Sequence, residues 1–352
     1  MIENTIYSTA TLLGVMREQE SPSDYWLSLL FPNQMTFETE WIEFEKVTTQ
    51  RKLAPLVVPM AQGKPIYTEA SHLARVKPGY VKPKDPVSLA RILKRRPGNL
   101  GTGVPGGTPQ SRYNSIIGDI MREHREAIER RWEWMASEAA QHGEITLADD
   151  AYPTTVVDFN RAAGHTVTLG VAARWGDSGV SILGDIEAWR TTMLKAKFGG
   201  PTNRITIGAD VWPVMTADAE IRELLKADSY RANNNGMNLN LGLRDPQDDK
   251  AQMVGRLSGT LEVWVYSDYY QDENGNAVDF MNTKDVVLTG PNVRGVRCFG
   301  AILDSDANFQ PLPIFPKMWK NQDPSVTYCM SQSAPLMVPV NPNNTFRARV
   351  LA

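Results

Sequence analysis

Residues Arg112–His142 read RYNSIIGDIMREHREAIERRWEWMASEAAQH and predict one long helix. Mostly apolar residues recur in it at spacings of three and four, the period of one helix face: Ile117, Met121, His124, Ile128, Trp132, Met135 and Ala139. The charged residues between them can form Glu–Arg pairs that support a helix: Arg122, Glu123, Arg125, Glu126, Glu129, Arg130 and Arg131. No proline interrupts the stretch, and Gly143 is a stop signal.

At a rise of about 1.5 Å per residue, such a helix would be roughly 45 Å long, so other elements must pack along it. A coiled-coil strand or a bundle helix is the simplest alternative, but a coiled coil needs three or four strict heptads. The neighbouring segments have the alternation and proline content of strands. We therefore predict an α+β protein in which this helix is a central spine.

The composition is that of a globular protein. The chain has 352 residues, of which 42% are hydrophobic and 22% charged, which argues against wholesale disorder and favours two subdomains. No apolar run is long enough to span a bilayer, and the N-terminus lacks the pattern of a secretion signal. The expectation is a protein without a membrane partner.

The cysteine content and the net charge limit which classes of protein this chain can belong to. Cys298 and Cys329 are the two cysteines and do not form a CxxC pair, so we expect two buried thiols. The formal net charge is −3. Proteins that grip nucleic acid normally carry a basic excess, so specific DNA binding is not expected.

The region before the long helix predicts extended structure. Residues 37–44 partly alternate, as a half-exposed strand does. Pro55 and Pro59 make a central strand position unfavourable for the apolar run Leu53–Met60. Val76–Asp85 is rich in lysine. Because its prolines exclude a helix, we expect it to be extended. Together these segments predict a long two-stranded excursion, and since an isolated hairpin is marginal in water, we expect it to lie on another molecule.

The region after the helix predicts a mixture of strands and helices. Strands are expected in 145–159, Arg204–Ile207, Leu261–Tyr266 and the tail 325–352, with a hairpin turn at Asn274-Gly275. Helices are expected over Ile186–Phe198, capped by Asp185, and from a Thr216 cap to about Asp228. A second subdomain is expected to begin near Gly170, and the tail strands to return to the first subdomain.

Sequence motifs for chemistry are weak. Residues 101–106 match GxGxxG, but no buried strand precedes them and Pro105 interrupts them. Asp272, Asn274 and Asn276 resemble the start of a calcium loop, but its required glycine and glutamate are absent, so we interpret them as a hairpin tip. The histidines are dispersed, and His124 is interpreted as a hydrogen-bonded core residue. We expect no catalytic residues, no cofactor and no metal, hence no enzyme.

One basic cluster precedes the long helix: Arg91, Lys94, Arg95 and Arg96. Two interpretations stay open. It is either a solvated face or a surface that pairs with acidic groups of a neighbouring subunit or with phosphate.

Several motifs resemble the lambda-type phage major capsid proteins (phage major capsid protein E family). Pro78, Gly79, Tyr80, Val81, Lys82, Pro83 and Lys84 form the heptad PGYVKPK, which is similar to that family's signature. Tyr7–Leu13 resembles its YTTAQLL start, and Asp185–Ala188 its DIEA helix start. Residues 332–337, QSAPLM, match as well, and the similarity runs nearly end to end, weakest between about 97 and 180.

This resemblance implies the Hong Kong 97-type phage capsid fold and a place for each segment. The N-terminal arm would be 1–31, with Tyr7, Leu12 and Leu13 contacting a neighbouring subunit, and the E-loop 48–85, with 78–84 as its inter-subunit contact. The peripheral (P) domain would comprise 32–47, 86–169 with the spine helix 112–142, and 306–352. The axial (A) domain would be 170–305. The loop 97–109 is glycine-rich here and more acidic in the lambda-type sequence.

The implied function is that of the structural head protein of a tailed double-stranded DNA bacteriophage. It would self-assemble as hexamers and pentamers into an icosahedral shell in the host cytoplasm and end in the virion capsid. Implied partners are a separate scaffolding protein, expected because no large extension precedes the arm, a portal at one vertex and a possible decoration protein. Packaged DNA would be enclosed without specific binding. Two alternatives remain: a nucleotide-binding enzyme using Gly101–Gly106, and a cargo-enclosing compartment shell of the same fold.

Overall fold

The structure, a computed structural model, describes residues 24–48, 62, 70–87, 109–149, 152–223, 251–257, 260–272, 274–323 and 326–352. These residues form an α+β protein, as predicted. Its helices are α2 (Tyr25–Leu30), α4 (Pro109–His142), α5 (Ile182–Lys195) and α6 (Val211–Ala217). Short 3-10 turns occur at Ala163–His165, Ser305–Ala307 and Pro342–Asn344. Among the described helices, none is both long and apolar enough to cross a membrane.

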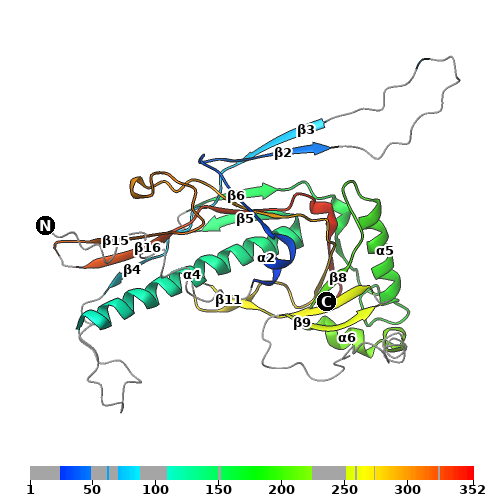
Figure 1. The fold of residues 1–352 in the computed structure, drawn as a ribbon. Coiled ribbons are helices and arrows are strands. Elements are labelled where there is room, and N and C mark those ends of the chain that lie inside the picture. Colours follow the sequence, from blue (N-terminus) through cyan, green and yellow to red (C-terminus); the bar gives the residue numbers. More distant parts are fainter. Residues whose placement is uncertain are drawn as a thin grey trace, which may run out of the picture.

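The predicted long helix is confirmed as α4, which has 34 residues and runs through the middle of the molecule (Figure 1). It begins three residues earlier than predicted, at Pro109, because proline is well suited to the first helical turn. It ends at Gly143, whose φ of 71° favours glycine. All seven residues of the predicted inner face are buried. On the other face, Arg125 pairs with Glu129 at 2.8 Å and Arg130 with Glu126 at 3.1 Å.

A six-stranded sheet forms one end of the molecule, in the order β7-β18-β13-β8-β10-β9. Its strands are β7 (Thr166–Thr168), β8 (Arg204–Gly208), β9 (Ala251–Leu257), β10 (Leu261–Tyr266), β13 (Asp285–Thr289) and β18 (Thr345–Arg349). In Figure 1, α5 and α6 lie beside this sheet. Trp189 stacks between Trp175 and Phe346 in the core that joins α5 to the sheet.

Several smaller sheets complete the described structure, and β4, β5, β16 and β17 contact α4. One has the order β1-β14-β17 and another β15-β16-β4, while β2-β3, β5-β6 and β11-β12 are two-stranded. Their strands are β1 (Asn33–Thr36), β2 (Ile42–Thr48), β3 (Ala70–Val76), β4 (Lys84–Val87), β5 (Glu144–Asp149), β6 (Tyr152–Asp158), β11 (Tyr269–Gln271), β12 (Ala277–Asp279), β14 (Val296–Phe299), β15 (Phe315–Lys320), β16 (Thr327–Gln332) and β17 (Pro335–Val338). The predicted hairpin turn at Asn274-Gly275 lies between β11 and β12, and Gly275 has a φ of 81°.

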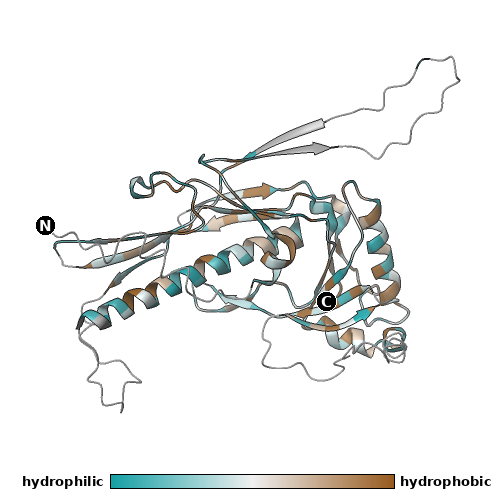
Figure 2. Cartoon of the chain, viewed as in Figure 1, coloured by the Kyte–Doolittle hydropathy of each residue, from teal (hydrophilic) through white to brown (hydrophobic). Residues whose placement is uncertain are grey.

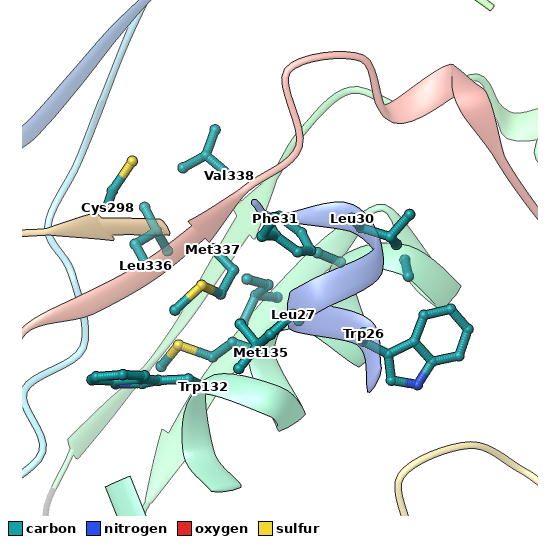
Figure 3. Packing of buried hydrophobic residues seen from close by; sticks show 14 of the residues in the cluster. Trp26, Leu27, Leu30, Phe31, Trp132, Met135, Cys298, Leu336, Met337 and Val338 are labelled. Carbon is teal, nitrogen blue, oxygen red and sulfur yellow. The ribbon is translucent and has the colours of Figure 1, made fainter. Parts of the chain in front are cut away.

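The largest apolar core joins α2, α4, β14 and β17. Leu27 of α2 lies beside Met135 of α4, and Trp26, Phe31 and Trp132 belong to the same buried cluster (Figure 3). Figure 2 shows the same arrangement as alternating hydrophilic and hydrophobic patches along α4, because only one side of the helix faces this core. This apolar stripe is buried along the length of α4.

Several sequence predictions about individual elements are wrong in detail. Of the strand expected over 37–44, only residues 42–44 are in a strand, the start of β2, while 37–41 connect β1 and β2 through bends. Helix α5 is capped by Ser181, whose Oγ accepts the Gly184 N–H at 3.1 Å; Asp185 instead accepts the Trp175 indole N–H at 2.9 Å. Thr216 lies inside α6, and the next helical turn is capped by Asp218, which accepts the Ile221 N–H at 3.0 Å.

The tail strands were expected to return to the first subdomain, which stays a prediction; their pairing partners lie in different parts of the chain. β16 pairs with β4 and β17 with β14, but β18 pairs with β13 and β7 of the six-stranded sheet. Residues 53–60, the glycine-rich loop up to residue 108 and most of the expected N-terminal arm lie outside the described residues. The division of the chain into arm, E-loop, P-domain and A-domain stays a prediction.

Candidate functional site

The heptad PGYVKPK follows β3 and ends at Lys84, the first residue of β4. It is hydrogen-bonded to distant residues of the same chain. Pro78 and Gly79 are buried. Val81 and Ser333 exchange two main-chain hydrogen bonds, of 2.9 and 3.0 Å, and the Ser331 N–H donates to the Pro83 carbonyl oxygen at 3.1 Å. The heptad therefore acts as a short strand against the turn after β16. Its predicted role as an inter-subunit contact stays a prediction.

Tyr80 adds side-chain hydrogen bonds to this attachment. Its hydroxyl donates to Gln332 Oε1 at 2.9 Å and accepts the Leu303 N–H at 3.0 Å. Partial burial raises the pKa of Tyr80, with Asp304 adding to the effect, so the hydroxyl stays protonated and able to donate. The heptad and the QSAPLM hexad were recognised separately in the sequence. The bond between Tyr80 and Gln332 shows that they are in direct contact.

Asp304 extends this network on the far side of Gln332. Its carboxylate accepts Lys317 Nζ at 2.9 and 3.1 Å and Gln332 Nε2 at 2.8 Å. Burial opposes ionisation of Asp304, but these donors outweigh it and hold the pKa below its ordinary value. The result is a fixed, charged anchor at the base of the heptad.

The heptad also presents two exposed lysines. Lys82 Nζ lies 4.6 Å from the Tyr80 ring centroid, and Lys84 Nζ lies 4.3 Å from that of Tyr328 and 5.2 Å from that of Trp319. Cation–π contacts hold both ammonium groups near the surface in defined positions. They are the residues of the heptad best placed to meet another molecule.

Strands β2 and β3 rise from this attached base. They pair only with each other among the described strands, from Ile42↔Val76 to Thr48↔Ala70. Figure 1 shows the pair running along the outside of β5 and β6 and away from them. At the base, Arg75 pairs with Glu43 at 3.0 Å and lies 4.9 Å from the Trp41 ring centroid, and Lys77 pairs with Glu40. The described part of the excursion therefore matches the predicted two-stranded form.

The described residues contain little that resembles a catalytic or metal site. No group of three or more His, Cys, Asp or Glu that could hold a metal occurs among them. Asp272 accepts the main-chain N–H groups of Asn274 and Asn276, as expected for a hairpin tip. His124 Nε2 lies 2.9 Å from Asp85 Oδ2 and Nδ1 3.3 Å from Ser331 Oγ, which confirms the interpretation of a hydrogen-bonded core histidine.

Comparison with known proteins identifies the family. The sequence model described as phage major capsid protein E matches residues 8–350. The chain belongs to this family.

Relatives and solved structures agree with this assignment. The chain is 28% identical over 346 residues to the major capsid proteins of Escherichia phages N15 and lambda, covering 96% of this chain and 97% of each relative. The crystal structure of a candidate prophage capsid protein from Escherichia coli CFT073 matches with a TM-score of 0.73 at 22% identity, over 98% of this chain and 99% of that one. The fold is the phage capsid fold of the Hong Kong 97 type.

Family membership makes this capsid protein a structural component of the virion shell and not an enzyme, as the sequence predicted. Several predicted contact residues of the capsid protein lie outside the described residues: Tyr7, Leu12, Leu13, Arg91, Lys94, Arg95 and Arg96. Both interpretations of the basic cluster remain open.

Two buried carboxylates of the capsid protein gave no signal in the sequence: Glu133 and Asp285. Glu133 is 3% and Asp285 0% exposed. Each is surrounded by residues far away in the chain, so no motif could have marked it. An unusual neighbourhood, Glu133 between Trp132 and Trp134, was the one available hint.

Proposed function

We propose that this chain forms the pentamers and hexamers of an icosahedral head that encloses the double-stranded DNA of a tailed phage. The match to the phage major capsid protein family over residues 8–350 carries the proposal. In it, residues 48–85 are the E-loop, which lies on a neighbouring copy, and residues 170–305 form the ring of A-domains around each capsomer axis. The N-terminal arm reaches a further copy.

The β2–β3 pair supports the E-loop assignment. A two-stranded sheet without a third strand or a covering helix is marginal in water, so a neighbouring molecule is the natural source of its missing contacts. The base of the pair is held by the Tyr80, Gln332 and Asp304 network, which would transmit a pull on the E-loop into the body of the subunit. Exposed Lys82 and Lys84 would meet the acidic side chains of the neighbour.

The remaining partners follow from the family resemblance. A scaffolding protein would guide assembly, a portal would occupy one vertex and a decoration protein could bind the finished shell. The net charge of −3 suits a container, because a strongly basic lining would hold DNA by counterion release. DNA would therefore be enclosed without specific contacts.

The test replaces residues 49–69 by Asn-Gly. Thr48 and Ala70 are paired in the ladder, so a two-residue turn closes the strands without altering their register. The variant and the natural chain are each expressed with the phage scaffold gene and viewed by negative-stain electron microscopy. We expect closed shells from the natural chain, and soluble subunits with an unchanged urea unfolding midpoint but no shells from the variant.

Two results would contradict the proposal at different levels. Normal shells from the variant would show that the E-loop assignment is wrong. Dispersed monomers from the natural chain, with and without the scaffold gene, would remove shell assembly itself. Particles that contain protein cargo in place of DNA would favour the compartment-shell alternative.

A further inference from the structure

The segment Asp24–Phe31, which contains α2, joins the two main parts of the fold. Trp26, Leu27 and Phe31 are buried against α4 and β17 in the core drawn in Figure 3. On the other side, the Tyr25 hydroxyl lies 2.7 Å from Thr206 Oγ1 of β8, and its ring stacks on that of Tyr266 of β10 at 5.0 Å. The segment therefore couples the long helix to the six-stranded sheet.

One buried carboxyl of α4 holds the start of this segment. Glu133 Oε1 accepts the Trp26 N–H at 2.7 Å and Oε2 the Leu27 N–H at 3.0 Å, and the Tyr266 hydroxyl lies 3.4 Å from Oε1. These N–H groups belong to the first turn of α2, where the helix itself provides no acceptor. Asp24, at the N-cap, makes no side-chain capping bond. Glu133 thus performs the capping from another helix.

The charge of this carboxyl is poorly compensated. Its acidic neighbours are Asp24 at the start of α2 and Asp268 beyond β10, and both oppose its ionisation. Two basic groups that contact this segment act on other partners: Arg297 lies 3.6 Å from Asp24, and Arg204 acts on Tyr25. No ion pair formed by the described residues includes Glu133, and a buried charge without an opposite charge is unfavourable.

We propose that the Glu133 carboxyl is a proton-dependent contact, which holds Asp24–Phe31 firmly against α4 when it is protonated and loosens that segment when it ionises. The protonated carboxyl accepts one of these main-chain N–H groups through its carbonyl oxygen and the other, more weakly, through its hydroxyl oxygen, and it carries no buried charge. Ionisation introduces that charge, and release of the segment lets water reach it.

The direction of the pH dependence follows from linkage. Burial raises the pKa of Glu133 from 4.5 to about 7, against the opposing effect of the Trp26 and Leu27 N–H groups. A released segment exposes the carboxyl to water and returns its pKa to the ordinary range. Since the docked form binds the proton more tightly, docking is strongest at low pH and weakens as pH rises through about 7.

Hydrogen–deuterium exchange of the full-length purified chain tests this inference. Peptides covering residues 24–31 are followed between pH 5.5 and 8.5, with rates corrected for the intrinsic pH dependence of exchange. We expect the protection of these amides to fall on the order of ten- to thirtyfold over this range. Peptides from β13 provide an internal reference and should keep their protection.

Two variants on the same helix isolate the carboxyl. Glu133→Gln has no proton to lose and should show pH-independent protection at residues 24–31. Glu126→Gln, whose carboxylate is paired with Arg130 on the outer face, should behave like the natural chain. Constant protection in the natural chain, an equal loss in β13, or an unchanged pH profile in Glu133→Gln would each overturn the inference. The profile of the natural chain decides even if a variant does not fold.

Discussion

Asp285→Asn should weaken the joint between the long helix and the six-stranded sheet. Asp285 begins β13 and is fully buried. Its carboxylate accepts Arg347 Nε at 2.7 Å and Arg349 Nε at 2.9 Å, and it also accepts Arg347 Nη2. Arg347 Nη1 lies 3.2 Å from His142 Nδ1 at the end of α4, so the carboxylate organises contacts between three elements.

Three arginines surround this site, Arg161, Arg347 and Arg349, and Glu138 and Glu144 lie near them. Arg161, which donates to the Ala140 and Gln141 carbonyl oxygens at 3.0 and 2.6 Å, is close enough to lower the pKa of His142. Burial, Arg347 and Arg161 bring the pKa of His142 to about 4, so this histidine is neutral at pH 7. Asp285 is the carboxylate that forms ion pairs with both arginines of β18.

The expected cost is about 3 kcal/mol. Breaking a buried ion pair from one side costs roughly 3–5 kcal/mol, because the other charge is left uncompensated. The lower value applies here because Arg349 has 38% of its side chain exposed and can be rehydrated, whereas Arg347 has 15%. For a chain of this size, about 3 kcal/mol corresponds to a fall of roughly 4 °C in Tm.

Urea and thermal unfolding of the purified subunit measure this effect. The matched control is Glu187→Gln, because Glu187 pairs with Arg190 at 2.6 Å but has 65% of its side chain exposed. Exposed pairs contribute about 1 kcal/mol or less, so the control should unfold almost like the natural chain. A loss below about 1 kcal/mol for Asp285→Asn would refute the reasoning that the buried carboxylate holds the joint together.

Two further predictions concern packing. Gly295→Ala should destabilise the subunit by about 2 kcal/mol or more, because the new Cβ would lie 2.4 Å from a main-chain oxygen and a ring carbon at the end of α2. Gly118→Ala, in α4 with no atom within 4 Å of the new Cβ, should instead stabilise the subunit by about 0.5–1 kcal/mol. A urea unfolding midpoint equal to that of the natural chain would contradict the prediction for either variant. Cys298 and Cys329 are buried, and burial raises the pKa of each thiol to about 12. Ellman's reagent at pH 8 should therefore react at least about a hundredfold more slowly with the native chain than with chain unfolded in guanidinium, and rapid labelling of the native chain would show that these thiols are accessible.

Local patterns in the sequence determined most of the elements. The apolar period of Arg112–His142 predicted both α4 and its buried face, because a helix with one apolar stripe has one stable way to lie on a core. Alternation and turn residues predicted β5, β6, β8, β10 and the hairpin at Asn274-Gly275 for the same local reason. The heptad and the hexad placed the chain in its family.

Tertiary structure alone decided how these elements meet. Glu133 caps a helix 107 residues away and Tyr80 bonds a residue 252 positions away, and no periodicity carries that information. The choice of Ser181 over Asp185 as the cap of α5 was settled by a competing partner, the Trp175 indole. Likewise β18 joins the six-stranded sheet because Arg347 and Arg349 find their counter-charge on β13. Sequence pattern determines which face of an element is apolar, but only packing in three dimensions determines which buried charge faces which donor.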